Sequence, residues 1–137
     1  PDHYAIQYSS RHDYHGFYNE EIRIREQFNY PPFCHIIRIL ISGEDEKSVI
    51  NTAIKIEKWM RHKVSKDTVI KAGLIEIGAY PAPLERIKNK YRWHVLIRIR
   101  KERIFLERYH EVVDQCQNEF YNTTNTIVVD FYPTSLL

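Results

Sequence analysis

The sequence predicts an α+β domain of the split βαββαβ type, a ferredoxin-like fold in which a four-stranded antiparallel sheet carries two helices on one face. Two segments repeat apolar residues at three- and four-residue steps, as amphipathic helices do. Four other segments are apolar or alternate with a period of two, as strands do. After a leading helical segment, these six follow one another as strand, helix, strand, strand, helix and strand. The 137 residues suffice for one domain with a buried core.

The leading segment reads as helical. The pattern over residues 3–12 weakly predicts a helix, and Asp13 can cap a firmer helix expected over 14–28, where apolar and aromatic side chains recur at helical steps. The pair Pro31-Pro32 ends that helix, because proline lacks the amide donor and restricts the residue before it. The expected division of the chain is therefore a helical segment over 1–30 and a folded domain over 31–137.

The first half of the domain reads as a strand and then a helix. Residues 33–41 read as a strand, and the run over 36–41 is apolar on both faces except at Arg38, as a central strand is. Ser42-Gly43 reads as a turn. An amphipathic helix follows over 45–63, with these residues on its apolar stripe: Val49, Ala53, Ile56 and Met60.

The second half reads as two strands, a helix and a final strand. The two strands cover 74–79 and 91–99. The Pro81-Ala82-Pro83 segment between them excludes central pairing, so we expect it to form a sheet edge or a bend. A second amphipathic helix over 103–121 and a last strand over 126–132 complete the pattern.

Alternation divides each strand between two faces of the sheet. The apolar set is expected under the helices: Ile37, Ile39, Ile41, Ile75, Ile77, Trp93, Val95, Ile97, Ile99, Ile127, Val129 and Phe131. The other set mixes charged and apolar side chains: Ile36, Arg38, Leu40, Leu74, Glu76, Gly78, Arg92, His94, Leu96, Arg98, Arg100, Val128, Asp130 and Tyr132. Such a face is either covered, for which the helix over 14–28 is a candidate, or open to a ligand.

The segment LERIKNKYR, residues 84–92, concentrates positive charge in a protein whose formal net charge is only +2. Spaced cations can neutralise successive phosphates, and aromatic rings can stack on bases. We therefore predict nucleic-acid contact at this hairpin; a solvated surface loop is the alternative. Trp93 is expected in the core. The candidate DNA-binding residues are Arg86, Lys88, Lys90, Tyr91 and Arg92, and a secondary basic patch comprises Arg98, Arg100, Lys101 and Arg103.

The sequence lacks the motifs of nucleotide binding, nucleophilic catalysis and metal or redox sites. No GxGxxG or P-loop sequence is present, and no GxSxG marks a nucleophile. Cys34 and Cys116 are isolated, so we expect two free buried thiols and neither a zinc site nor a redox pair. His12 and His15 lack an obvious third ligand, and we expect surface histidines there. We expect this chain to be neither an enzyme by itself nor a binder of any cofactor or metal.

Several motifs together resemble the C-terminal part of the bacterial replication-restart helicase family, primosomal protein N′ (PriA). In chain order they are Asp13-Tyr14, Phe17-Tyr18, Glu20 or Glu21, Arg25, Tyr30-Pro31-Pro32-Phe33, Gly78, Pro81-Ala82-Pro83, Arg86, Tyr91-Arg92-Trp93, Val129-Asp130-Phe131-Tyr132-Pro133 and Ser135-Leu136. Tyr132 stands where the family usually has a second acid, so that acid's role does not carry over. The resemblance covers essentially the whole chain.

The resemblance implies a domain similar to ribosomal protein S10, which binds branched DNA within an ATP-dependent 3′→5′ helicase. ATP, magnesium and zinc would belong to other domains of a longer parent, and residues 1–30 would lead from its helicase core. Expected partners are forks and duplex arms of DNA, the tail of the single-stranded DNA-binding protein, other primosome proteins and the helicase core, with no membrane contact. The expected roles are DNA replication restart and primosome assembly, in the bacterial cytoplasm near the nucleoid.

Two other functions fit the same strand order. The first is a protein-interaction module that docks on the helicase core and on the single-stranded DNA-binding protein, with incidental DNA contact. The second is an RNA-binding domain of the RRM type, but the aromatic signature on its third strand is missing, since Arg92, His94 and Arg98 occupy the outward positions.

Overall fold

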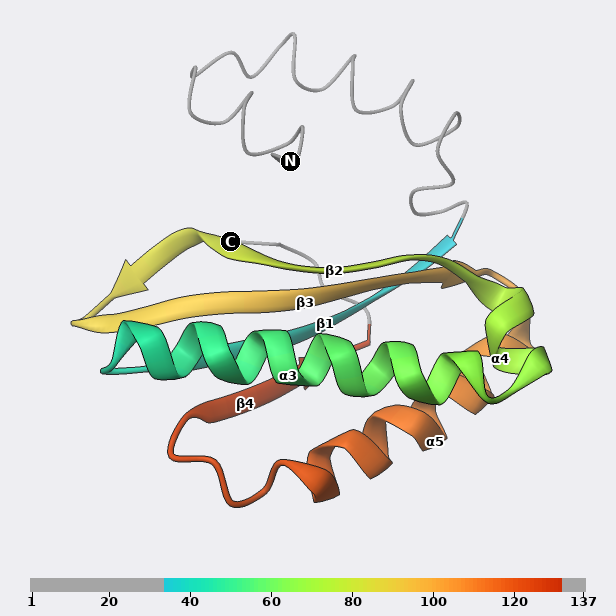
Figure 1. The fold of residues 1–137 in the computed structure, drawn as a ribbon. Helices are drawn as coiled ribbons and strands as arrows, with labels where there is room; N and C mark the ends of the chain where they lie inside the picture. Colours follow the sequence, from blue (N-terminus) through green and yellow to red (C-terminus); the bar gives the residue numbers. More distant parts are fainter. Residues whose placement is uncertain (1–33, 132–137) are drawn as a thin grey trace, which may run out of the picture.

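A computed structural model describes residues 34–131, so the helical segment expected over 1–30 lies outside the described residues. The described elements form one sheet with helices packed on one of its faces (Figure 1). In chain order these elements are β1 (Cys34–Gly43), α3 (Glu46–Ser65), α4 (Thr68–Gly73), β2 (Leu74–Ile87), β3 (Lys90–Arg100), α5 (Arg103–Glu119) and β4 (Thr126–Asp130).

The four strands lie in the order β2-β3-β1-β4, and every neighbouring pair is antiparallel. The strands β1 and β3 are therefore central, and α3 and α5 lie side by side on one face of the sheet (Figure 1). This arrangement confirms the predicted split βαββαβ fold. The strand β2 is at the edge, which is where the prolines at 81 and 83 are tolerated, as predicted.

The core lies between the sheet and the two long helices. Isoleucines and valines of β1 and β3 meet apolar side chains of α3 and α5 there. The fully buried members include Ile37, Ile39, Ile41, Val49, Ala53, Ile56, Met60, Val95, Ile97, Ile99, Tyr109 and Val113. The thiols of Cys34 and Cys116 are free and buried, and burial raises their pKa to about 11 and about 12 respectively, so both stay protonated at neutral pH.

Two predicted face assignments, those of Leu74 and Ile75, were wrong. Leu74 packs against the core under the helices, whereas Ile75 packs on the opposite face of the sheet. The reason is a register shift at the start of β2: Leu74 pairs with Ile99 and Glu76 with Arg98, so Ile75 is an extra residue in the ladder. Such a bulge exchanges the faces of the residues before it, which strict alternation cannot anticipate.

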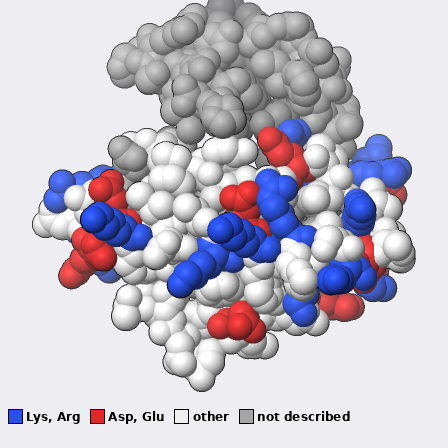
Figure 2. All heavy atoms as spheres, viewed as in Figure 1, with Lys and Arg blue, Asp and Glu red and all other residues white. Residues whose placement is uncertain are grey.

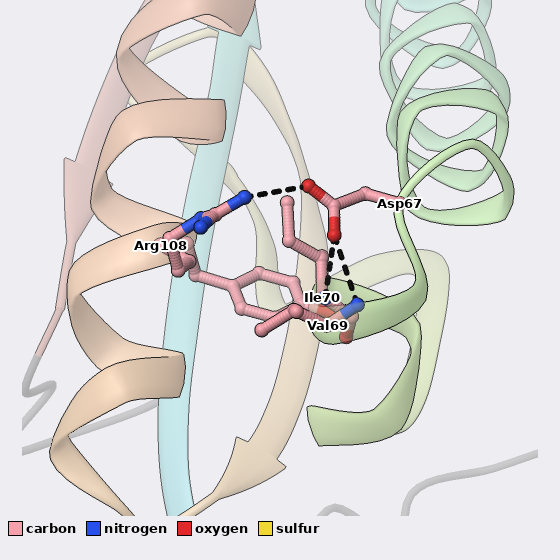
Figure 3. Close-up of polar contacts among 5 residues, drawn as sticks. Asp67, Val69, Ile70 and Arg108 are labelled. Carbon is pink, nitrogen blue, oxygen red and sulfur yellow. Dashed lines mark hydrogen bonds and ion pairs between the residues drawn. The ribbon is translucent and has the colours of Figure 1, made fainter.

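The short helix α4 was missing from the predicted elements. It begins after Asp67, whose carboxylate accepts hydrogen bonds from the backbone amides of Val69 at 2.9 Å and Ile70 at 3.2 Å (Figure 3). The other carboxylate oxygen accepts a hydrogen bond from Nη2 of Arg108 on α5 at 2.8 Å. Asp67 therefore caps α4 and ties it to α5. Beside it, the buried hydroxyl of Tyr109 donates to the carbonyl of Ile70 at 2.8 Å.

We expect Asp67→Ala to lower the midpoint of thermal unfolding at neutral pH, and Asp67→Asn to lower it less, because the amide oxygen can still cap. The Ile70 amide, the Val69 amide and Arg108 lower the pKa of Asp67, partly opposed by its desolvation. The stabilisation is therefore present above the ordinary carboxyl pKa of about 3.9 and is lost as the pH falls through the lowered value. In melting curves recorded from neutral to acid pH, the difference in unfolding midpoint between the parent and Asp67→Ala should become smaller in acid. Equal midpoints at neutral pH would contradict this role.

Candidate nucleic-acid interface

The candidate site is the hairpin that joins β2 to β3. Its turn consists of Lys88 and Asn89, flanked by the pair Ile87 and Lys90. Both turn residues have positive φ, 52° and 65°, as a two-residue type I′ turn requires. Glycine and asparagine are preferred in this conformation, whereas a lysine adopts it at some energetic cost. The sequence predicts the hairpin but not this turn, because Lys-Asn is a weaker turn signal than Asn-Gly.

A large irregularity in β2 precedes the turn. Pro81 pairs with Trp93, and the next pair is Arg86 with Tyr91, so four residues of β2 face Arg92 alone. Arg92 braces this bulge by donating from Nη1 to the carbonyl of Leu84 at 2.7 Å. Burial lowers the pKa of the Arg92 guanidinium, as expected for a cation held against the protein.

The candidate cations surround the turn instead of forming one row. Arg86 lies opposite Tyr91, and its guanidinium lies over that ring at 5.2 Å from the centroid. Tyr91 packs toward the core under the helices, so Arg86 is on the helix side of the sheet. Lys90 directly precedes Tyr91 on β3 and therefore lies on the opposite side of the sheet. Lys88 is at the turn between Arg86 and Lys90. All three cations are exposed.

Trp93 packs against the core on the helix side, as predicted. Arg86 also donates to the side-chain oxygen of Asn89 at 3.3 Å, which holds the guanidinium beside the turn. The hairpin is thus a braced element with exposed cations on two sides.

The secondary basic patch lies at the other end of the sheet. Ile99 pairs with Leu74 there, nine residues along β3 from Lys90, which corresponds to about 30 Å. Two of its cations have ion-pair partners: Arg98 donates from Nε to Glu76 at 2.9 Å, and Arg100 lies 3.2 Å from Glu102. The other two, Lys101 and Arg103, are exposed and make no ion pair within residues 34–131.

The mixed face of the sheet holds a buried polar contact. Nε of Arg38 donates to Nδ1 of His94 at 3.1 Å, and the two residues are only 7% and 2% exposed. Burial lowers the pKa of Arg38, the charge of Arg92 lowers it further, and Asp130 acts in the opposite direction. His94 is therefore a buried hydrogen-bond acceptor on the mixed face. The helix proposed to cover this face lies outside the described residues.

Two further features bear on function. Within residues 34–131, no group of three histidine, cysteine or acidic side chains is arranged to hold a metal ion. None of the helices in the same range is both long and apolar enough to cross a membrane.

The fold and the hairpin together define a split βαββαβ domain with a braced basic β-hairpin at one end. The chain belongs to the family of primosomal protein N C-terminal domains, whose family model matches residues 26–134. It is 30% identical to the replication restart protein PriA of Borreliella burgdorferi and 27% identical to that of Bacillus subtilis, in both cases over its full length. The PriA of Synechocystis is 34% identical over 72% of the chain. The chain spans only 19%, 16% and 11% of these three relatives.

Proposed function

We propose that this chain is the DNA-binding C-terminal domain of a replication-restart helicase. In this role it helps the parent recognise branched DNA at stalled forks and supports assembly of the primosome. The folded domain would extend over 31–137, with 1–30 leading from the helicase core. ATP, magnesium and zinc would bind other domains of the parent. The name of the relatives, replication restart protein, supports a role in replication restart. The basic hairpin supports the DNA contact.

The observation that carries the proposal is the charge of the hairpin turn. Residues 86–92 contain four cations and no acid. Lys88 adopts the left-handed conformation, in which glycine or asparagine would cost less, so the turn holds a cation at an energetic cost. Lysine is a point charge that suits phosphates, whereas base reading relies on bidentate side chains aimed at base edges. The hairpin therefore suits contact with the sugar–phosphate backbone.

We expect Lys88→Gly to raise stability and weaken DNA binding at once. Glycine adopts positive φ without a steric penalty, so the free energy of unfolding should rise by about 0.5–1 kcal/mol. The loss of one phosphate contact should reduce the slope of log K against log salt by about 0.9. Urea unfolding measures the change in stability, and DNA binding at a series of salt concentrations measures the change in slope, both on the same sample. A variant that is more stable and binds with an unchanged slope would show that Lys88 does not contact DNA.

The proposal is tested by fluorescence anisotropy of the chain with a duplex, a model fork and a single strand across a salt series. Lys88→Ala/Lys90→Ala removes two exposed cations and keeps Arg92, which braces the bulge. Lys63→Ala/Lys71→Ala, on α3 and α4, is the control with the same charge loss. We expect the hairpin variant to lose about 1.8 units of salt slope and the control to keep the parent slope. Equal slopes in parent and hairpin variant would overturn the hairpin as the DNA site.

The docking alternative has one supporting observation. Lys101 and Arg103 are exposed cations without an ion pair among residues 34–131, at the end of the sheet far from the hairpin. An acidic tail, such as that of the single-stranded DNA-binding protein, could meet such a patch. Under this alternative Lys101→Ala/Arg103→Ala would weaken binding of an acidic peptide and leave DNA binding unchanged, whereas the hairpin variant would change neither.

A further inference from the structure

The outer face of α3 carries a continuous stripe of hydrogen-bond donors. Its members follow one another at steps of three or four residues, so they lie on one side of the helix. All are exposed or partly exposed, opposite the buried stripe that contains Val49, Ile56 and Val64. We call this set the α3 basic stripe, and its members are Lys47, Asn51, Lys55, Lys58, His62 and Lys66. From first to last it extends about 28 Å, at 1.5 Å per residue.

The stripe contains no acidic residue. Opposite charges three or four residues apart would stabilise the helix, whereas like charges, such as those of Lys55 and Lys58, weaken it. The acids of α3 lie elsewhere: Glu46 is in the first turn, and Glu57 is engaged by Arg61 at 2.7 Å. No ion pair within residues 34–131 involves a lysine of the stripe.

Charge is divided between the two helices that cover the sheet. The neighbouring helix α5 exposes these acids: Glu107, Glu111, Asp114 and Glu119. Figure 2 shows blue side chains, with red ones among them, along the face on which α3 lies. In a protein of formal net charge +2, such segregation produces a local positive field that the total charge does not reveal.

We propose that the α3 basic stripe binds the phosphate backbone of a duplex arm. This inference rests on the proposed function for its choice of DNA as the ligand, and it adds a surface separate from the hairpin residues. The length of the stripe corresponds to about eight base pairs, at 3.4 Å per pair. Amide and imidazole donors, such as those of Asn51 and His62, commonly contact phosphate oxygens between lysines.

The hairpin and the stripe can contact the same arm. Gly43, at the end of β1, pairs with Tyr91 beside the hairpin, and α3 begins three residues later. The first turn of α3 is thus at the hairpin end of the sheet, and the stripe leads from there toward α4 (Figure 1). A duplex arm lying along α3 would have the hairpin at one end of its contact.

The test compares Lys55→Ala/Lys58→Ala with the parent and with Lys63→Ala/Lys71→Ala, using a duplex of about 24 base pairs and salt from about 50 to 200 mM. Lys63 is on the same helix but outside the stripe, where its ammonium lies over the Trp59 ring. We expect the stripe variant to lose about 1.8 units of salt slope and the control to lose none. Lys55→Arg/Lys58→Arg should restore the parent slope, because the charges return.

The outcomes separate this inference from the proposed function. If the hairpin variant loses slope and the stripe variant does not, the hairpin remains the DNA site and the stripe proposal is overturned. If the stripe variant alone loses slope, the stripe stands and the hairpin is overturned. If the parent binds no duplex, both are overturned. A stripe variant that binds duplex normally but loses affinity for poly-glutamate would identify a protein-docking face and also overturn the proposal.

Discussion

Ile97→Ala is expected to lower the free energy of unfolding by about 3 kcal/mol, within the range of about 2–5 kcal/mol for such truncations. Ile97 is fully buried on the central strand β3 and pairs with Ile37 of β1 and Ile77 of β2. Three isoleucines thus cross the sheet under the helices, and truncating the middle one leaves a cavity whose walls are held by the backbone ladders on both sides. Small domains are stable by only about 5–15 kcal/mol, so the loss is a large part of the total.

Urea unfolding monitored by circular dichroism measures this loss, with Val128→Ala as the matched control. Val128 is on the edge strand β4 and is 52% exposed, so its truncation should change stability by less than about 0.5 kcal/mol. If Ile97→Ala and Val128→Ala cost the same, the side chain of Ile97 does not lie in the core as described.

Asn125→Asp is expected to cost about 2–3 kcal/mol at neutral pH, although the two side chains have nearly the same shape. Nδ2 of Asn125 donates to the carbonyl and the hydroxyl of Ser48, both at 3.2 Å, and to the hydroxyl of Thr52 at 2.8 Å. A carbonyl can only accept, so the amide nitrogen must face it. An ionised carboxylate has no proton to donate there and would repel that oxygen. A close contact leaves little room for adjustment, since a Cβ on Gly43 would collide with Oδ1 of Asn125.

The cost of Asn125→Asp should depend on pH with a definite sign. The site disfavours the charged form, so the introduced carboxyl should have a pKa above its ordinary value of about 3.9. Destabilisation is then greatest above that raised pKa and is relieved as the pH falls through it, because the protonated carboxyl can donate. Ionisation is thus destabilising at this site, whereas ionisation of Asp67 is stabilising; in both cases the gap between parent and variant narrows in acid. Melting curves of the parent and the variant over the same pH range measure the difference, and a pH-independent gap would contradict the hydrogen-bond account.

Apolar periodicity was sufficient to predict most of the fold. The strand at 91–99 and the helices at 45–63 and 103–121 correspond to β3, α3 and α5 with small changes at their ends. Periodicity failed where the backbone departs from regular geometry. The bulge at Ile75 reversed the face of Leu74, and the six-residue α4 is too short to show a period, although Asp67 before Thr68 is a usable cap signal.

The candidate site was predictable only in part. A cluster of cations between two strand patterns located the hairpin, but the two-residue turn decides that Arg86 and Lys90 lie on opposite sides of the sheet. The brace from Arg92 to the Leu84 carbonyl depends on the bulge and has no sequence signal. The α3 basic stripe does not stand out as a run along the chain, because a helix gathers residues that are three and four apart.

The proposed contact between the braced hairpin and DNA phosphates can be tested residue by residue through the backbone amide chemical shifts of the isotopically labelled chain, measured as duplexes of two unrelated sequences and equal length are added. We expect large shifts over residues 84–92, of similar pattern with both sequences, because phosphate contacts carry no sequence information. Amides of the hairpin that stay unchanged while DNA binds elsewhere, or that shift with only one of the two sequences, would contradict the claim.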